Sequence, residues 1–290
     1  MIMEFQKSKR VYFVLLAITC LLVIVLFIPR IATIAGEPVY VSLLTGNRAV
    51  QSVALRWILT LLGLFLAQMV SSAIASSVGN REFQKIAAVL LQRCDSTAFF
   101  LQAGPLFQTG SRQAAVVKDY LIGKGYLATG AYEQAVALWE KAREEADVEW
   151  ITHDMRVSLC GVCANACIGY VEAGQYDAAV KLYSRLKALA DAAVNHREAF
   201  ASAERLCLAT RAYIAAFAKE GYNDTAAIGE HIEQAKNEYD RVLLHYALAR
   251  LCERLNLWEE AERSYRYVAA NGNTFVWAAA AKERLQARGK

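Results

Sequence analysis

Residues 130–142 read Gly-Ala-Tyr-Glu-Gln-Ala-Val-Ala-Leu-Trp-Glu-Lys-Ala, and residues 174–186 and 256–268 follow the same pattern. Each segment begins with a turn residue, has an aromatic residue two positions later, an alanine three positions further on, and a second aromatic residue four positions after that. Gly130, Gly174 and Asn256 can adopt the left-handed conformation that ends a helix. The alanine is small where two helices would cross closely, so each segment predicts a helical hairpin.

The pattern resembles the tetratricopeptide repeat (TPR), a helix–turn–helix unit of about 34 residues. The family's Leu, Gly and Tyr positions are taken in turn by Ile122, Gly123 and Tyr126, by Ala166, Cys167 and Tyr170, and by Leu248, Ala249 and Cys252. The residues that carry the repeat signature are Gly123, Tyr126, Gly130, Tyr132, Ala135, Trp139, Ala142, Tyr170, Gly174, Tyr176, Ala179, Tyr183, Trp258, Ala261 and Tyr265. The chain departs from the family in lacking its late proline, and the three turns are 44 and 82 residues apart.

An all-α fold is expected, because no proline follows Pro105 and helix-favouring residues dominate the rest of the chain. Residues 114–290 are expected to form a TPR-like α-solenoid of helical hairpins, preceded by linker helices over 79–113. The long second interval predicts a degenerate hairpin between Arg197 and Asp240. A last helix from Phe275 to Ala287 would cap the stack.

The first predicted membrane helix is residues 11–28, a run of 18 residues without a charge. Its length is roughly 27 Å at 1.5 Å per residue, close to the thickness of a bilayer core. A buried core helix and a signal peptide are the alternatives. The run exceeds the ~7–15 apolar residues of a signal peptide, which favours an uncleaved anchor.

The second predicted membrane helix is residues 57–78, which also carries no charge but contains Gln68 and four serines. Its small residues would let it pack against the first span, while an interfacial or soluble helix is the alternative. Six Lys and Arg residues flank the two spans on their outer ends, against three in the loop between them. This bias predicts a cytoplasmic segment at 1–10, an external loop at 29–56 and a cytoplasmic repeat domain.

In the TPR family, the first helix of each hairpin lines a concave groove that binds a protein or peptide. The resemblance implies that the groove residues here are Tyr120, Lys124, Ala164, Ile168, Tyr246, Arg250 and Glu253. This mixture of aromatic, aliphatic and basic side chains suits an extended or helical peptide with some acidic character. Of the clamp used by chaperone-binding members only Asn165 matches, which disfavours a chaperone co-factor.

The segment Cys160-Gly-Val-Cys163-Ala-Asn-Ala-Cys167 could serve redox chemistry or metal binding. In the repeat register these cysteines fall at helix-packing positions, where cysteine behaves as a small buried hydrophobe. A zinc site would need a second pair of ligands, and none is evident in the sequence. Packing is the favoured interpretation, and a redox- or metal-responsive sensor is the alternative.

The remaining sequence contains no nucleophile–base arrangement, cofactor motif or metal-ligand pattern, so an enzyme is not expected. The net charge of +4 comes without a basic block, which disfavours nucleic-acid binding. The expected function is a non-catalytic, multi-pass membrane scaffold that mediates protein–protein interaction or complex assembly. Homo-oligomerisation through the spans or the end repeats stays open.

Overall fold

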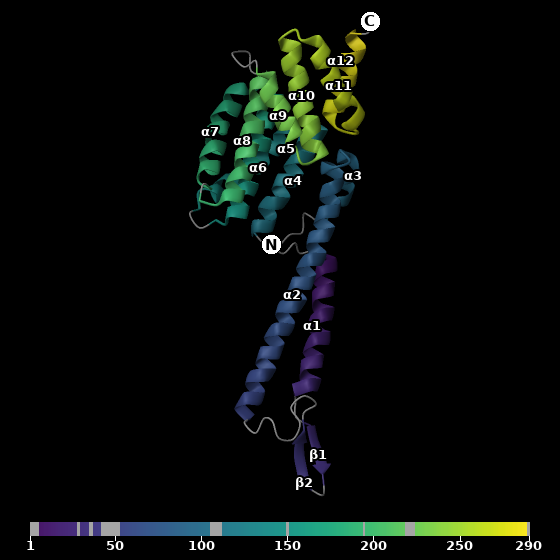
Figure 1. The fold of residues 1–290 in the computed structure, drawn as a ribbon, viewed down its shortest axis with the longest axis vertical. Coiled ribbons are helices and arrows are strands. Elements are labelled where there is room, and N and C mark those ends of the chain that lie inside the picture. Colours follow the sequence, from purple (N-terminus) through teal and green to yellow (C-terminus); the bar gives the residue numbers. More distant parts are fainter. Residues whose placement is uncertain are drawn as a thin grey trace. The chain divides into compact units, whose positions relative to one another are not determined.

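The computed structural model describes residues 6–27, 30–34, 37–41, 53–104, 112–148, 151–193, 195–217 and 224–288. These residues form two compact units, Met1–Phe83 and Gln84–Lys290, which are described separately. Figure 1 labels the elements in chain order. The described part is helical, in agreement with the expected all-α class, apart from one short hairpin of strands in the first unit.

The first unit contains α1 (Gln6–Phe27), the strands β1 (Arg30–Ile34) and β2 (Glu37–Val41), and most of α2 (Val53–Leu91). The first predicted span lies in α1 except for its last residue, which lies outside the described residues. The two strands pair antiparallel, with Arg30 opposite Val41 and Ile34 opposite Glu37. This hairpin lies within the segment expected to be a loop, and its Ile, Thr, Val and Tyr residues favour extended backbone.

Within the described residues, one helix is long and apolar enough to cross a membrane. It is the part of α2 from Thr60 to Leu91, where an 18-residue window has a mean hydropathy of 1.7 and is only 17% buried. Large apolar side chains are exposed on both helices, including Phe13 and Ile18 on α1 and Phe65 on α2. The apolar surface of this unit is therefore turned outward rather than gathered in a core.

A row of small residues on α2 is buried within the first unit. Ala67, Ser71 and Ala75 follow one another at intervals of four, so they lie on one face of the helix. The hydroxyls of Ser71 and of Thr19 on α1 are 3.4 Å apart, within hydrogen-bonding distance. The small face of α2 is therefore the one that meets α1.

The second unit consists of the end of α2 and ten further helices in the described residues. These are α3 (Ser96–Gln102), α4 (Arg112–Thr129), α5 (Tyr132–Ala146), α6 (His153–Glu172), α7 (Tyr176–Asp191), α8 (Arg197–Phe217), α9 (Thr225–Glu233), α10 (Glu238–Arg254), α11 (Trp258–Asn271) and α12 (Val276–Arg288). From α4 to α12, each helix packs against the next in the chain. The interval expected to hold a degenerate hairpin contains α8 and α9, and the last helix, expected over Phe275–Ala287, is α12.

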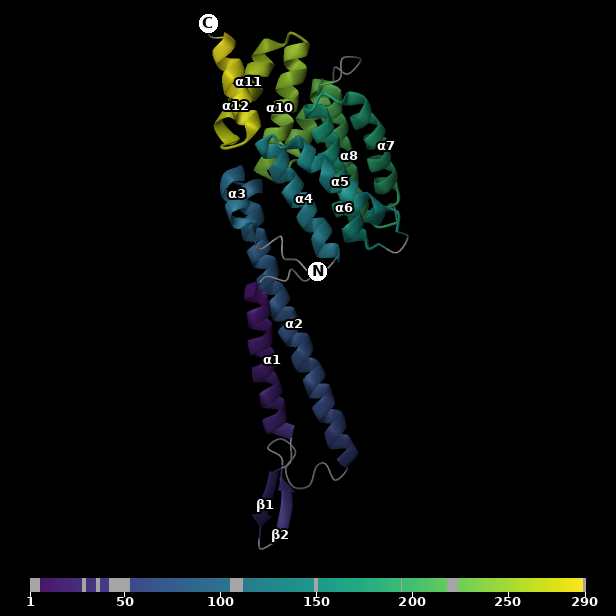
Figure 2. The same cartoon turned by 180° about the vertical axis from the view of Figure 1, so that it is seen from behind.

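Helix α6 is the centre of this unit. It packs against α4, α5, α7 and α8, an arrangement that can be followed from both sides in Figures 1 and 2. Every residue from Leu159 to Gly169 is buried. This stretch is therefore enclosed on all sides, and its cysteines, glycines and alanines are small enough for four neighbours to approach.

The three segments of the repeat pattern have the same turn geometry. Gly130, Gly174 and Asn256 have positive φ values of 79°, 73° and 59°. After Gly130, the N–H of Ala131 donates to the carbonyl of Tyr126 at 2.8 Å, and the turns at Gly174 and Asn256 contain the equivalent bond, also at 2.8 Å. This six-to-one bond satisfies a carbonyl left free at the helix end. The alanines that follow, Ala135, Ala179 and Ala261, are fully buried.

The residues that join α2 to α3 are tied to the turn between α11 and α12. The N–H of Ser96 donates to Thr274 Oγ1 at 2.8 Å, and the N–H of Thr274 donates to the carbonyl of Cys94 at 3.3 Å. Asn273 Nδ2 donates to the carbonyl of Arg93 at 3.1 Å. The beginning of the second unit is therefore held to its last helices.

Candidate binding pocket

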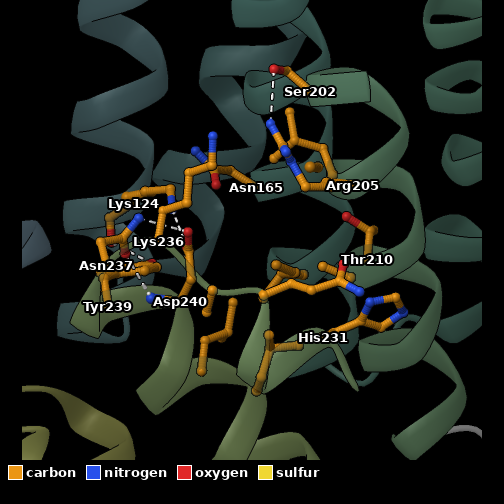
Figure 3. Close-up of a pocket in the computed structure, with 18 of the residues that line it drawn as sticks. Lys124, Asn165, Ser202, Arg205, Thr210, His231, Lys236, Asn237, Tyr239 and Asp240 are labelled. Atoms are coloured by element: carbon orange, nitrogen blue, oxygen red, sulfur yellow. Dashed lines mark hydrogen bonds and ion pairs between the residues drawn. The ribbon is translucent and has the colours of Figure 1, made fainter. Parts of the chain in front are cut away.

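A pocket of about 240 Å³ opens between five helices of the second unit. Its walls come from α4, α6, α8, the end of α9 and the start of α10, as Figure 3 shows in close-up. Many of its residues are apolar, including Val157, Ile168, Leu206 and Leu243. Its polar residues form three groups with different roles.

The first group is a buried ion pair between Lys124 and Asp240. Lys124 is 5% exposed, and its ammonium contacts the Asp240 carboxylate and lies 4.3 Å from the centre of the Tyr239 ring. Burial opposes the charged form of Lys124, but the attraction of Asp240 and Tyr120 outweighs it, so the pKa of Lys124 is raised. Asn237 Nδ2 also donates to Asp240 Oδ2 at 2.8 Å. Both charges of this pair are therefore compensated inside the protein.

The second group is formed by two buried polar side chains with unused hydrogen-bonding capacity. Asn165 is 4% exposed and donates from Nδ2 to the carbonyl of Tyr120 at 2.9 Å, while its Oδ1 has no donor among the described residues. Thr210 is 2% exposed, and in the described part of the chain its hydroxyl has no hydrogen-bond partner. In Figure 3 this hydroxyl points into the pocket.

Two glycines leave room for the Asn165 and Tyr120 side chains between α4 and α6. A Cβ on Gly123 would lie 2.8 Å from Asn165 Nδ2, and a Cβ on Gly161 would lie 2.5 Å from the Tyr120 ring. Both distances are too short for a real contact, so any larger residue would push α4 and α6 apart. The bare backbone at these positions brings the two walls together.

The third group consists of two cations without an acidic partner. Arg205 on α8 donates from Nη2 to Ser202 Oγ at 3.1 Å, and Lys236 lies just before α10. Neither forms an ion pair with the described residues, and both are exposed to solvent. Because Asp240 is already neutralised by Lys124, the mouth of the pocket carries an excess of positive charge.

The predicted groove residues divide between this pocket and another part of the unit. Tyr120, Lys124, Ala164 and Ile168 line the pocket. Lys124 was expected to point towards a partner, but it is buried in the ion pair with Asp240.

The other three, Tyr246, Arg250 and Glu253, do not line this pocket. Tyr246 is buried and lies beside the Trp277 ring. Glu253 accepts hydrogen bonds from Tyr265 at 2.7 Å and Arg284 at 2.6 Å. Arg250 lies 3.7 Å from Glu253 and over the Phe217 ring of α8 at 5.0 Å. Tyr246 and Glu253 therefore contact α11 and α12, and Arg250 contacts α8.

The polar residues of the pocket that sequence reasoning missed are Ser202, Arg205, Thr210, His231, Gln234, Lys236, Asn237, Tyr239 and Asp240. They lie in the interval between the second and third repeat segments, where no signature assigns a register to α8 and α9. The only local signal at Arg205 is that no acidic residue lies three or four positions away from it on its helix.

The cysteines of α6 lie in the core. Cys160, Cys163 and Cys167 are buried and unpaired. Burial raises the pKa of the Cys160 thiol to about 12 and also raises the pKa of Cys163. Over the residues that the structure describes, no group of three His, Cys, Asp or Glu side chains could hold a metal ion. This geometry favours packing over the redox and metal alternatives, because the reactive species is the thiolate.

A second cleft of about 390 Å³ lies between α11 and α12. Three arginines line it, but each is already engaged: Arg266 with Glu262 at 2.6 Å, Arg284 with Glu253 at 2.6 Å, and Arg288 with the face of Trp258 at 4.1 Å. Its positive charge is therefore largely compensated. The pocket beside α6 is the better candidate site.

No family model, curated protein or solved structure matches this chain.

Proposed function

We propose that this chain is a membrane-anchored, non-catalytic scaffold whose TPR-like domain binds a segment of a partner protein in the pocket beside α6. The observation that carries the proposal is the pocket itself. It combines apolar walls, two buried polar groups with unused capacity and two uncompensated cations. Pockets of this composition are typical of binding sites.

The anchor in this proposal is a hairpin of two membrane helices, α1 and α2. The exposed apolar side chains on both helices support it, as does the small-residue face of α2 with its Thr19–Ser71 contact. The bias of Lys and Arg supports a cytoplasmic placement of the repeat domain. A reporter fused to the C-terminus tests this placement, and reporter activity outside the cytoplasm would reverse it.

A TPR-like arrangement is supported by three turns that share a positive φ and the same hydrogen bond, and by the packing of consecutive helices. A non-catalytic role is supported by the state of the polar groups in the pocket. Lys124 is held in its charged form by Asp240 and is therefore no nucleophile. In the described residues, no hydrogen bond joins the hydroxyls of Ser202 and Thr210 to the imidazole of His231.

Site-specific photo-crosslinking in native membranes tests the proposal. A benzophenone amino acid at Gln234, on the rim of the pocket, should form an adduct with one partner protein. The same amino acid at Val180, which is exposed on α7, should not form that adduct. Filling the pocket with Ala209→Phe should abolish the Gln234 adduct. The proposal fails if the adduct also forms from Val180, or survives Ala209→Phe in a folded protein.

A further inference from the structure

The uncompensated cations at the pocket mouth indicate the charge of the occupant. Arg205 and Lys236 come from different walls, one from α8 and the other from the residues before α10. The acidic residue of the lining, Asp240, is bound to Lys124 and Asn237. It therefore provides no counter-charge for Arg205 or Lys236. A ligand with two separated acidic groups would therefore complement this site.

The wall between the cations indicates what separates those acidic groups. Leu206 lies one residue after Arg205, and Leu243 and Leu244 lie seven and eight residues after Lys236. Val157 and Ile168 contribute further apolar surface from α6. An apolar side chain placed between the acidic groups would be removed from water here.

The buried polar groups indicate the backbone conformation of the occupant. The Thr210 and Asn165 side chains are 2% and 4% exposed and line the pocket, so a ligand there can hydrogen-bond to the Thr210 hydroxyl and to Asn165 Oδ1. A helical peptide has already used its own N–H and C=O groups. An extended peptide presents one N–H and one C=O per residue, and it can satisfy both side chains.

We infer that the pocket selects an extended peptide segment in which acidic residues flank an apolar one. Arg205 and Lys236 would contact the acidic side chains. Thr210 and Asn165 would contact the peptide backbone, and the apolar side chain would enter between α6 and α10. The inference rests on the proposed function, since it specifies the partner segment bound at the same site.

Fluorescence polarisation with the full chain in detergent tests this selection. The probes are three pools of labelled nonapeptides with a central leucine. Both flanking positions carry glutamate in the first pool, glutamine in the second and lysine in the third. The other positions vary among Ala, Ser, Thr and Val. We expect the glutamate pool to bind at least tenfold more tightly than the glutamine pool, and its affinity to fall as salt is raised.

Substitutions in the pocket assign this preference to residues. Arg205→Gln and Lys236→Gln should each weaken binding of the glutamate pool about fivefold, the effect of one partly exposed ion pair. Lys282→Gln on α12 removes the same charge from an exposed position away from the pocket and should leave binding unchanged. Thr210→Val keeps the side-chain shape and should weaken all three pools alike, because it removes a backbone contact.

Several outcomes would overturn the inference. The acidic class of partner would be ruled out by equal binding of the glutamate and glutamine pools or by no binding of the glutamate pool. Full affinity in Arg205→Gln and Lys236→Gln would also rule it out. If a helix-stapled glutamate peptide bound as tightly as the glutamate pool, the extended conformation of the occupant would be ruled out. The Gln234 crosslinking adduct does not depend on charge selection. Its persistence would leave the scaffold function standing while the peptide class fails.

Discussion

The buried ion pair between Lys124 and Asp240 allows a sharp test of how this domain is stabilised. We predict that Asp240→Asn is far more destabilising than Lys124→Met, although each removes one member of the same pair. Asp240→Asn keeps the shape of the side chain but leaves the ammonium buried against Tyr239 without a counter-charge. Lys124→Met removes the buried charge and keeps most of the apolar stem.

The magnitude follows from the exposure of the two groups. Removing one partner of a fully buried pair costs about 3–5 kcal/mol. The Lys124 side chain is 6% exposed but that of Asp240 is 35% exposed, so water can reach part of the site. We therefore expect the lower end, about 3 kcal/mol, for Asp240→Asn. For Lys124→Met we expect about 1 kcal/mol, because the remaining carboxylate keeps its hydration and its bond from Asn237.

Thermal unfolding of the full chain in detergent, followed by tryptophan fluorescence, measures both effects. Asp240→Asn should lower Tm by about 6–12 °C, and Lys124→Met by about 2–4 °C. The double variant should be more stable than Asp240→Asn alone, because it contains no buried unpaired charge. Equal effects of the two single changes, or strict additivity in the double variant, would refute this account of the pair.

The pH dependence of the pair has a definite sign. The pKa of Lys124 is raised in the folded protein, so its contribution to stability is complete below the unfolded value of about 10.4. It is lost only as pH rises through the folded value. The Tm difference between Asp240→Asn and the unaltered chain should therefore be constant between about pH 6 and pH 8. A difference that disappears within this range would contradict the raised pKa.

Three further predictions concern helix packing, thiol reactivity and acid response. Gly161→Ala places a Cβ 2.5 Å from the Tyr120 ring and should lower the free energy of unfolding by about 2 kcal/mol; Gly229→Ala, which meets no atom within 4 Å, should not lower it. Because burial raises the pKa of Cys160 to about 12, alkylation of this thiol at pH 8 should be roughly a thousandfold slower in the folded than in the unfolded chain; rapid native labelling would contradict this. Burial also raises the pKa of Glu172, so the folded state binds this proton more tightly than the unfolded state and Tm should rise as pH falls towards 5. Glu172→Gln should remove that rise, and an unchanged pH profile of Tm in this variant would contradict the assignment to Glu172.

The repeat turns and most helices could be predicted because their information is local. Gly130, Gly174 and Asn256 stand where a chain must turn through positive φ, and few residues tolerate that conformation. A continuous apolar run likewise needs no knowledge of its neighbours, and most of the predicted span 57–78 lies in the helix Thr60–Leu91, which is long and apolar enough to cross a membrane. These features belong to single segments of the chain.

The binding pocket could be predicted only in part, because it depends on which faces of the helices meet. Tyr120 and Ile168 were assigned to it from the repeat register, but Arg205, Thr210 and Lys236 lie where that register fails. The signature also placed Lys124 on an open groove. Asp240, 116 residues away, holds it in the interior instead.

The sequence by itself determined the kind of elements: helices with a regular turn signature, and apolar stretches suited to a membrane. Only the tertiary structure decided that the start of the second unit is bound to its last helices, as in the bond between Ser96 and Thr274 across 178 residues. It also decided which helices enclose the pocket. The physical reason is clearest in α6. From Leu159 to Gly169 it is buried on every side, so its own periodicity cannot indicate which neighbour covers which side. That choice is made by the packing of four other helices around it.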